Sequence, residues 1–249
     1  HDPAEPSTMR TSLASLLLVC WPVAAATAGQ PEIDPSWTWV ETPYAKPVID
    51  RGAAGSWEHY AVDNPYVHSE GGKYYCFYEA QDKPFPQGGH ERFGLAVSTD
   101  GVRWKKSDSN PIFDVGPDGA WDDVVAKLPA GVIRREGRYW LFYSGRDGTT
   151  KQIGAATAAR LEGKWTRLAR NPVIKSRPAA WDRHISTYPA PVFEMGGKYH
   201  LLYRGMQGFY RQQGPGLAVS DDLVYWRRAP QAESGPLIPV SEEIASLAV

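Results

Sequence analysis

The sequence has few cysteines, almost no net charge and no long apolar run. Its 249 residues contain two cysteines, Cys20 and Cys76, too few for a disulfide framework. The formal net charge is −1 and no basic stripe stands out, so we expect no nucleic-acid partner. The apolar run from Leu13 to Val23 is too short for a membrane span. We therefore expect a protein that neither depends on disulfides, nor binds nucleic acid, nor spans a membrane.

Residues 1–28 are interpreted as upstream residues and a signal peptide. Met9-Arg10, the apolar run and the small-residue site Ala26-Thr27-Ala28 predict a secretory signal that is cleaved before Gly29. A lipoprotein signal at Cys20 is disfavoured because Val19 is bulky for that position. The mature protein is thus expected to be secreted or periplasmic, with Cys76 as a small buried hydrophobe.

A motif recurs three times in the rest of the chain. Each copy reads Trp-acid, an extended run, Gly-Lys/Arg-Tyr and an alternating aromatic stretch ending in Tyr, over residues 57–78, 121–143 and 181–203. The tryptophans lie 64 and 60 residues apart, a period that suits four-stranded β-propeller blades with long loops. This predicts a partial propeller domain over 29–249, with blades at about 57–113, 121–174 and 181–238.

Each copy also predicts its own strands. The aromatic runs are bounded by glycine and favour buried second strands, at 74–78, 139–143 and 199–203. Gly71-Gly72 and Gly196-Gly197 predict hairpin turns, which places the first strands at 66–69, 131–134 and 191–194. The third strands follow in stretches such as 94–97, and the fourth begin at the next Trp. The predicted fold class is all-β, a propeller of four-stranded antiparallel blades.

The segment before the first copy indicates how a ring would close. Residues 36–50 match the segments that begin at Trp104 and Trp165, so we interpret them as a lone outermost strand. Propellers close by sharing one blade between their two ends. Because no fourth Trp-acid copy follows before Val249, we expect this chain to be the N-terminal part of a longer propeller, five-bladed when complete.

The repeats resemble a known superfamily. Gly-Lys-Tyr-Tyr-x-Phe-Tyr, Gly-Leu-Ala-x-Ser-x-Asp-Gly-x-x-Trp and Asn-Pro-Ile, with the variant Ala-Arg-Leu-Glu-Gly-Lys-Trp at 159–165, are similar to the five-bladed propeller glycoside hydrolases. That superfamily includes families 43, 32, 117 and 130. The resemblance covers residues 36–240 and implies a carbohydrate substrate; we expect no cofactor and no metal. The Ser-x-Asp-Gly-x-x-Trp turn is one residue shorter than the Asp-box of six-bladed sialidases, which therefore rank lower.

Blade geometry predicts that the site lies at one end of the strands. The start of a first strand and the end of its antiparallel second strand lie side by side, and the first strand lines the central channel. Two sets of residues would therefore meet: Asp63, Lys127 and Thr187 from the first strands, and Glu79, Asp82, Arg146, Asp147 and Arg204 from the second.

Asp63 is the main catalytic candidate. It stands where the resembling hydrolases carry a general base or nucleophile, which suits activation of water against an anomeric carbon. The alternative is an Asx turn ahead of Pro65. The remaining carboxylates of that family pattern do not line up, because Lys127-Leu128 and Thr187-Tyr188 occupy the positions of an Asp and a Glu in families 43 and 32.

Substitutes for the missing acid lie nearby. Glu79 and Asp82 end the second strand of the first blade, where desolvation would raise the pKa of a carboxyl so that it serves as an acid. Either residue is equally interpreted as a solvated loop acid. His184 is a third catalytic candidate, since family 117 relatives are thought to use a histidine as acid, and its alternative is a polar loop residue. His90 and Glu91, in the loop after this strand, are candidate substrate contacts.

Lys127, Arg146 and Arg204 form a basic set at the same predicted end. Leu201-Leu202-Tyr203-Arg204-Gly205 resembles the arginine-bearing strand end with which family 130 phosphorylases bind phosphate. A bidentate arginine would equally bind the carboxylate of an acidic sugar. The remaining alternative is that these side chains form structural ion pairs with Asp63, Glu79 or Asp147.

Residues that recur in every copy are interpreted as structural, because a catalytic group has no reason to occur once per blade. They are the acids after each first Trp and those of the later turns: Glu58, Asp122, Asp182, Asp100 and Asp221. The tryptophans are interpreted as packing residues: Trp57, Trp104, Trp121, Trp165, Trp181 and Trp226. For Trp57, Trp121 and Trp181 the alternative is stacking on a sugar ring.

Two functions from different classes remain open. The first is a secreted glycoside hydrolase that acts on poly- or oligosaccharides, such as arabinose- or xylose-type side chains, by carboxylate acid/base catalysis. A family 130-like phosphorylase is its variant, which secretion disfavours because phosphorolysis uses intracellular phosphate. The second is a noncatalytic carbohydrate-binding propeller, which the missing carboxylates favour.

Overall fold

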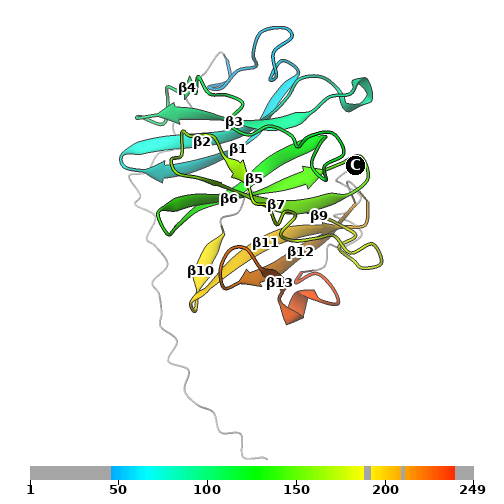
Figure 1. Cartoon of the computed structure of the whole chain (residues 1–249). Helices are drawn as coiled ribbons and strands as arrows, with labels where there is room; N and C mark the ends of the chain where they lie inside the picture. Colours follow the sequence, from blue (N-terminus) through cyan, green and yellow to red (C-terminus); the bar gives the residue numbers. More distant parts are fainter. Residues whose placement is uncertain (1–45, 188–191, 209–210, 239–249) are drawn as a thin grey trace, which may run out of the picture. The chain divides into compact units, whose positions relative to one another are not determined.

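Strands joined by turns and longer loops make up the described chain, residues 46–187, 192–208 and 211–238 of the computed structural model (Figure 1). Two 3-10 helices of one turn each, η1 (Phe85–Gln87) and η2 (Pro230–Ala232), interrupt them. The all-β class is confirmed. The predicted signal peptide and most of the predicted outer strand, residues 1–45, lie outside the described residues, and residues 46–50 form bends rather than a strand.

Three units of one design follow each other along the chain. Unit 1 consists of β1 (Ala61–Glu70), β2 (Lys73–Gln81), β3 (Glu91–Ser98) and β4 (Lys105–Lys106). Unit 2 consists of β5 (Val125–Arg135), β6 (Arg138–Arg146), β7 (Lys151–Ala158) and β8 (Thr166–Arg167). Unit 3 consists of β9 (His184–Thr187), β10 (Phe193–Met195), β11 (Lys198–Met206), β12 (Gln212–Ser220) and β13 (Trp226–Arg228).

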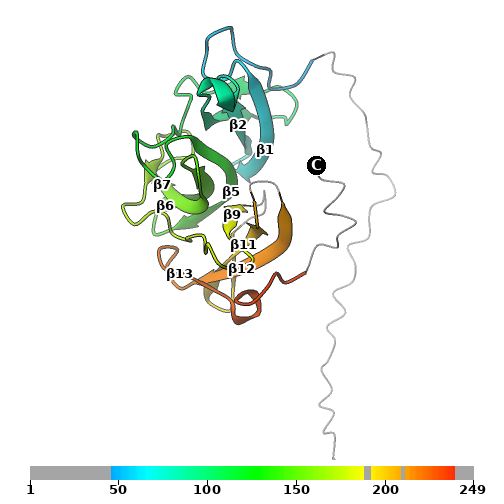
Figure 2. The same cartoon turned by 90° about the vertical axis from the view of Figure 1, so that its right-hand side faces the viewer.

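Each unit is an antiparallel meander. β9 and β10, on either side of residues 188–191, both pair with β11, so together they take the place of one first strand. A parallel pairing of Glu91 with Val125 joins units 1 and 2 into one sheet. β5 also lies against β1 and β9, so the first strands of the three units gather on one side (Figure 2).

Glycine turns fix the register between the first and second strands. Gly71 and Gly72 have φ of 59° and 73°, and Gly196 and Gly197 have 60° and 70°. Two consecutive residues of positive φ form the primed hairpin turn that matches the twist of its strands. Both predicted hairpins are therefore confirmed, and Glu136-Gly137, with φ of 50° and 74°, forms the equivalent turn of unit 2.

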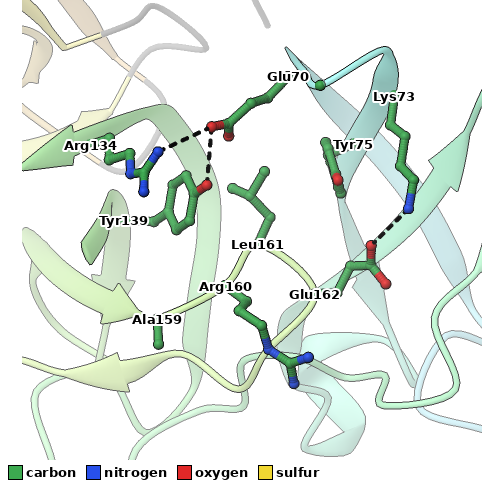
Figure 3. A pocket seen from close by; sticks show the side chains of 10 residues that line it. Glu70, Lys73, Tyr75, Arg134, Tyr139, Ala159, Arg160, Leu161 and Glu162 are labelled. Carbon is green, nitrogen blue, oxygen red and sulfur yellow. Dashed lines mark hydrogen bonds and ion pairs between the residues drawn. The ribbon is translucent and has the colours of Figure 1, made fainter. Parts of the chain in front are cut away.

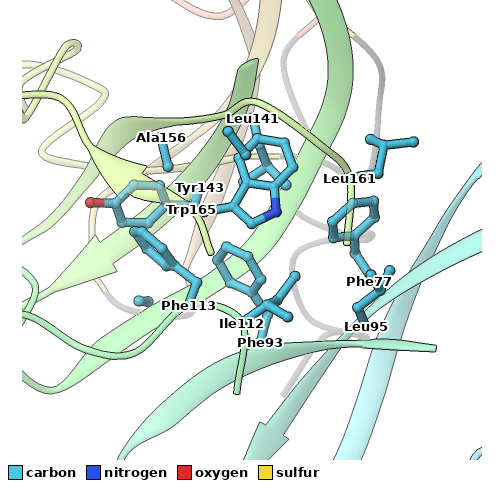
Figure 4. Packing of buried hydrophobic residues seen from close by; sticks show 12 residues of the cluster. Phe77, Phe93, Leu95, Ile112, Phe113, Leu141, Tyr143, Ala156, Leu161 and Trp165 are labelled. Atoms are coloured by element: carbon cyan, nitrogen blue, oxygen red, sulfur yellow. The ribbon is translucent and has the colours of Figure 1, made fainter. Parts of the chain in front are cut away.

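Hydrophobic side chains fill the space between successive units. Phe77, Phe93 and Leu95 of unit 1 pack with Leu141 and Tyr143 of unit 2 in a cluster that also contains Trp165 (Figure 4). The ring of Trp165 meets that of Phe77 edge-on, with centroids 5.8 Å apart, and Trp226 of unit 3 meets Phe142 of unit 2 at 5.2 Å. These two tryptophans are packing residues, as predicted, and each one joins its unit to the unit before it.

The acid after each first Trp is buried inside its own unit. Each accepts a hydrogen bond from the tyrosine that ends the aromatic run: Glu58 from Tyr78 at 2.9 Å, Asp122 from Tyr143 at 2.8 Å and Asp182 from Tyr203 at 3.1 Å. Each also pairs with a basic residue of the last strand: Lys106 at 2.8 Å, Arg167 at 2.8 Å and Arg228 at 2.6 Å. The structural interpretation of these acids is thus confirmed.

The acid of the later turn differs from the prediction in unit 3. Asp100 caps its turn by accepting from the backbone N–H groups of Val102 and Arg103, at 2.9 and 2.8 Å. In unit 3 this role falls to Asp222. The prediction of Asp221 was wrong by one position, because the Asp that caps the turn lies two residues after the serine that begins it. Asp221 instead pairs with Lys198 at 2.5 Å.

Candidate functional site

β1 and β2 bring two carboxylates together at one end of unit 1. Asp63 lies opposite Glu79 in the antiparallel register, beside a bulge between Asp63 and Tyr66. Asn64, at a φ of 44°, donates its side-chain amide to Asp63 Oδ1 at 3.3 Å and to Glu79 Oε2 at 3.2 Å. Asp63 is exposed, whereas Glu79 is only 2% exposed. The predicted meeting of first-strand start and second-strand end is confirmed here.

Lys127 of unit 2 completes this group. Its Nζ lies 3.3 Å from Glu79 Oε1 and 2.7 Å from Glu91 Oε2. Glu91 begins β3 and reaches Lys127 because β3 and β5 pair next to it. Of the alternatives for Lys127, the structure shows the ion pair. We call Asp63, Glu79, Glu91 and Lys127 the acid cluster.

Burial and like charge perturb the acids of this cluster. Desolvation raises the pKa of Glu79 to about 7, and the carboxylates of Glu91 and Asp63 act in the same direction against the opposing effect of Lys127. Desolvation, followed by the charge of Glu91, also raises the pKa of Asp63. Burial opposes the charge on Lys127, but the two glutamates outweigh it and raise the lysine pKa. Asp63 and Glu79 therefore hold protons more tightly than isolated carboxyls do.

A basic group lies beside the acid cluster on units 2 and 3. Arg146 ends β6, and Lys151 begins β7 directly opposite it. Burial, together with the charges of Lys127 and Arg146, lowers the pKa of Lys151 to about 8, and Arg204 of β11 contributes to this shift. The pKa of His184 is lowered by burial and by Arg183 and Lys151. We call Arg146, Lys151, Arg204 and His184 the basic group.

Lys151 is the site residue that sequence reasoning missed. Our prediction considered the start of the first strand and the end of the second, but the third strand begins at that same end as well. A lysine two residues before the predicted third-strand stretch of unit 2, which begins at Ile153, was the available signal. Lys151 adds its own positive charge to those of Lys127, Arg146 and Arg204, which act on it electrostatically.

Two other predicted site residues, Asp82 and Asp147, instead make hydrogen bonds that stabilise loops. Asp82 accepts from the backbone of His90 at 2.9 Å and pairs with Arg92 at 3.0 Å. Despite desolvation, these contacts lower the Asp82 pKa. Asp147 caps its own turn by accepting from the backbone N–H groups of Thr149 and Thr150, at 2.7 and 2.8 Å.

Unit 3 has no acid at the position of Asp63. In unit 1, Asp63 lies opposite Glu79, the residue that follows the last tyrosine of the aromatic run. The equivalent pair in unit 2 is Lys127 with Ser144. In unit 3 it is Ser186 with Arg204. The strand position in unit 3 therefore belongs to Ser186 rather than to Thr187. Both side chains are buried and contact Ser144 at 2.9 Å.

Two kinds of feature are absent from the described residues. No group of three or more His, Cys, Asp or Glu side chains in this part of the chain is arranged to hold a metal ion. No helix of this part is long and apolar enough to cross a membrane.

The chain is similar in sequence to longer proteins. No family model matches it. An uncharacterised protein of Mycobacterium tuberculosis is 30% identical over 167 residues, 66% of this chain and 52% of the relative. The β-1,2-mannobiose phosphorylase of a Thermoanaerobacter species is 28% identical over 41% of this chain and 36% of its own length. The chain thus spans about half the length of the mycobacterial relative and less of the phosphorylase.

Solved structures share the fold. A glycosyl hydrolase from Bacteroides ovatus matches 74% of this chain and 53% of its own with a TM-score of 0.55 and 21% identity. A family 117 glycoside hydrolase from Zobellia galactanivorans matches 73% of this chain and 58% of its own with a TM-score of 0.56 and 20% identity. The predicted resemblance to glycoside hydrolases is confirmed at the level of the fold.

Proposed function

We propose that this chain carries the acid/base carboxyl of a carbohydrate-active enzyme with the propeller fold, and that the enzyme cleaves glycosidic bonds. The observation that carries the proposal is the acid cluster, in which one exposed carboxyl, Asp63, lies against two buried glutamates and a half-buried lysine. Acid/base catalysis needs an accessible carboxyl whose pKa is raised, and Asp63 is such a group.

Asp63 is the group that would touch the substrate. Its raised pKa favours the protonated form that a general acid needs to release a leaving oxygen. Glu79 and Glu91 are too buried to reach a sugar directly. We assign them as positioning residues that, with Lys127 and Asn64, orient Asp63 and set its pKa.

The basic group supports a role for an anion at this site. Burial first, and then the positive charges of Lys127, Arg146 and Arg204, lower the pKa of Lys151, and a bound anion would offset that positive charge. Phosphate as the attacking nucleophile would make the reaction a phosphorolysis, and the likeness to a mannobiose phosphorylase favours this second candidate. Water as the nucleophile, with a sugar carboxylate in the anion site, would make it a hydrolysis. Export through the predicted signal segment favours hydrolysis.

A turnover assay of the full-length protein tests the proposal. Oligosaccharides and aryl glycosides, including arabinosides, xylosides and mannosides, would be incubated with and without inorganic phosphate. We expect cleavage, which Asp63→Asn reduces by at least a hundredfold in kcat because it removes the proton donor and keeps the shape. A sugar 1-phosphate product would identify phosphorolysis, and a free sugar hydrolysis.

The matched control is Asp100→Asn, which removes a carboxylate of the same unit from an exposed turn. It should keep the activity of the unmodified protein. Retained turnover in a folded Asp63→Asn variant would refute the assignment, and glycan binding without any turnover would favour the noncatalytic alternative.

A further inference from the structure

A cavity lies at the opposite end of units 1 and 2 from Asp63. Its volume is about 350 Å³, and ten residues line it (Figure 3): Glu70, Gly71, Lys73, Tyr75, Arg134, Tyr139, Ala159, Arg160, Leu161 and Glu162. Glu70 is the last residue of β1 and follows Asp63 by seven positions. A strand rises about 3.3 Å per residue, so on the order of 20 Å separates the cavity from the acid cluster.

The cavity has an apolar floor between two aromatic walls. Leu161, 5% exposed, lies between the rings of Tyr75 from β2 and Tyr139 from β6 (Figure 3). Both rings are partly exposed. A saccharide ring presents C–H groups on its faces and hydroxyls at its edge, so a slot between tyrosine faces suits it.

Ion pairs hold the rim of the cavity in place. Glu70 accepts a hydrogen bond from the Tyr139 hydroxyl at 3.1 Å and lies 3.8 Å from Arg134. Glu162 lies 3.8 Å from Lys73 on the other side. These contacts orient Tyr139 and leave both carboxylates of the rim already matched with cations.

Two polar groups of the cavity, the Arg160 guanidinium and the Tyr75 hydroxyl, are available to a ligand. Within the described residues, no ion pair or hydrogen bond involves the Arg160 guanidinium or the Tyr75 hydroxyl. Arg160 is exposed beside the apolar floor. A guanidinium in this position offers a planar pair of donors that matches a carboxylate in two parallel hydrogen bonds.

We infer that this cavity is a second saccharide-binding site, which takes a sugar unit carrying a carboxylate. The sugar ring lies over Leu161 between Tyr75 and Tyr139, and its carboxylate pairs with Arg160. Such a site would hold an acidic polysaccharide at a distance from the acid cluster. The inference goes beyond the proposed function, because binding here requires no bond cleavage.

Calorimetric titration of the full-length protein tests this site. The ligands are trigalacturonate and its carboxyl-reduced form, which has the same backbone without charge. We expect trigalacturonate to bind, and the reduced trisaccharide to bind at least tenfold more weakly. Arg160→Gln should weaken trigalacturonate binding by at least tenfold, because it removes the charge-assisted hydrogen bonds to the carboxylate. Tyr75→Ala should abolish binding through loss of a stacking wall.

Two controls separate this site from the rest of the molecule. Arg170→Gln removes an exposed arginine that stacks on Tyr225 elsewhere, and it should leave binding unchanged. Asp63→Asn should also bind normally, even if it has lost turnover. The inference is overturned if trigalacturonate does not bind, if the reduced form binds equally well, or if Arg160→Gln and Tyr75→Ala variants with native circular dichroism bind like the unmodified protein. Loss of binding in Asp63→Asn would assign the ligand to the acid cluster instead.

Discussion

At the scale of single residues, the acid cluster shows how one exposed carboxyl depends on buried ones. Glu79 and Glu91 are 2% and 7% exposed, and Lys127 lies between them. Removing either glutamate leaves the lysine less compensated, whereas removing Lys127 leaves two carboxylates buried without a cation. The pKa of Asp63 should therefore respond to changes that never touch the substrate.

Glu91→Gln should move the pH dependence of turnover. The charge of Glu91 raises the pKa of Asp63, so its loss lowers that pKa. If Asp63 acts as an acid, kcat/KM falls as pH rises through its pKa, and the variant should lose activity at a lower pH than the unmodified protein. Profiles of kcat/KM against pH measure this. An unchanged descending limb would show that Glu91 does not tune the catalytic group.

Glu79→Gln should flatten the pH dependence of stability. Desolvation raises the pKa of Glu79 from 4.5 to about 7, so the folded state binds more protons than the unfolded state between these values. The contribution of Glu79 to the free energy of unfolding is fully present below pH 4.5. It is lost as the pH rises to about 7, by on the order of 3 kcal/mol.

Urea unfolding of the Glu79→Gln variant at several pH values between 4.5 and 7.5 measures this effect. The unmodified protein should lose more stability across this range than the variant. Glu136→Gln, which changes an exposed glutamate, should behave like the unmodified protein. Parallel curves for Glu79→Gln and the unmodified protein would contradict the raised pKa.

At the scale of elements, each unit is organised around the tyrosine that ends the aromatic run of its second strand. A buried acid and a neighbouring Trp ring contact this tyrosine, and the facing third strand carries glycine where the ring needs space. A Cβ on Gly154 would lie 2.7 Å from the Tyr143 ring and 2.8 Å from Trp121. The third strand of each unit thus carries glycine opposite the tyrosine ring for a steric reason.

Gly154→Ala should destabilise the protein by about 1–3 kcal/mol, because the added methyl forces the Tyr143 and Trp121 rings apart. Gly148→Ala is the matched control, since a Cβ there meets nothing within 4 Å. Thermal unfolding followed by circular dichroism measures both variants. Equal melting temperatures for the two would show that the rings move aside at no cost.

At the scale of the whole described part, the units are joined through tryptophans and through the site itself. Trp165 packs on Phe77 of the unit before it, and Lys127 of unit 2 reaches the glutamates of unit 1. Because the acid cluster contains residues of two units, its geometry requires that these units stay docked. Folding and the proposed activity should therefore fail together.

Trp165→Ala should weaken this docking. Trp165 is 6% exposed, and loss of a buried Trp side chain costs about 3–5 kcal/mol. Denaturant unfolding followed by both fluorescence and circular dichroism should show a lower midpoint and transitions that no longer coincide. Tyr60→Ala, which removes an exposed aromatic ring, should leave the transition unchanged. A coincident, unshifted transition in Trp165→Ala would show that the units are held together by other contacts.

The sequence by itself determined the repeats, their strands and the structural acids. These features depend on local rules: strand periodicity, glycine turns, and the recurrence of one motif in three copies. It also placed Asp63 and Glu79 at one end of unit 1, because antiparallel pairing makes the end of one strand the neighbour of the start of the next. Local chemistry and a counted register are enough for predictions of this kind.

Only the tertiary structure decided which groups meet between units. Lys127 pairs with Glu79 and Glu91 because unit 2 docks on unit 1, and Lys151 joins the basic group because a third strand begins there. The unit 3 position belongs to Ser186 rather than to Thr187, because the number of residues between this position and the hairpin glycines differs between units. Burial, which sets the pKa of Glu79, also depends on neighbours from distant parts of the chain. Contacts of this kind depend on how the units pack, and no local pattern encodes that.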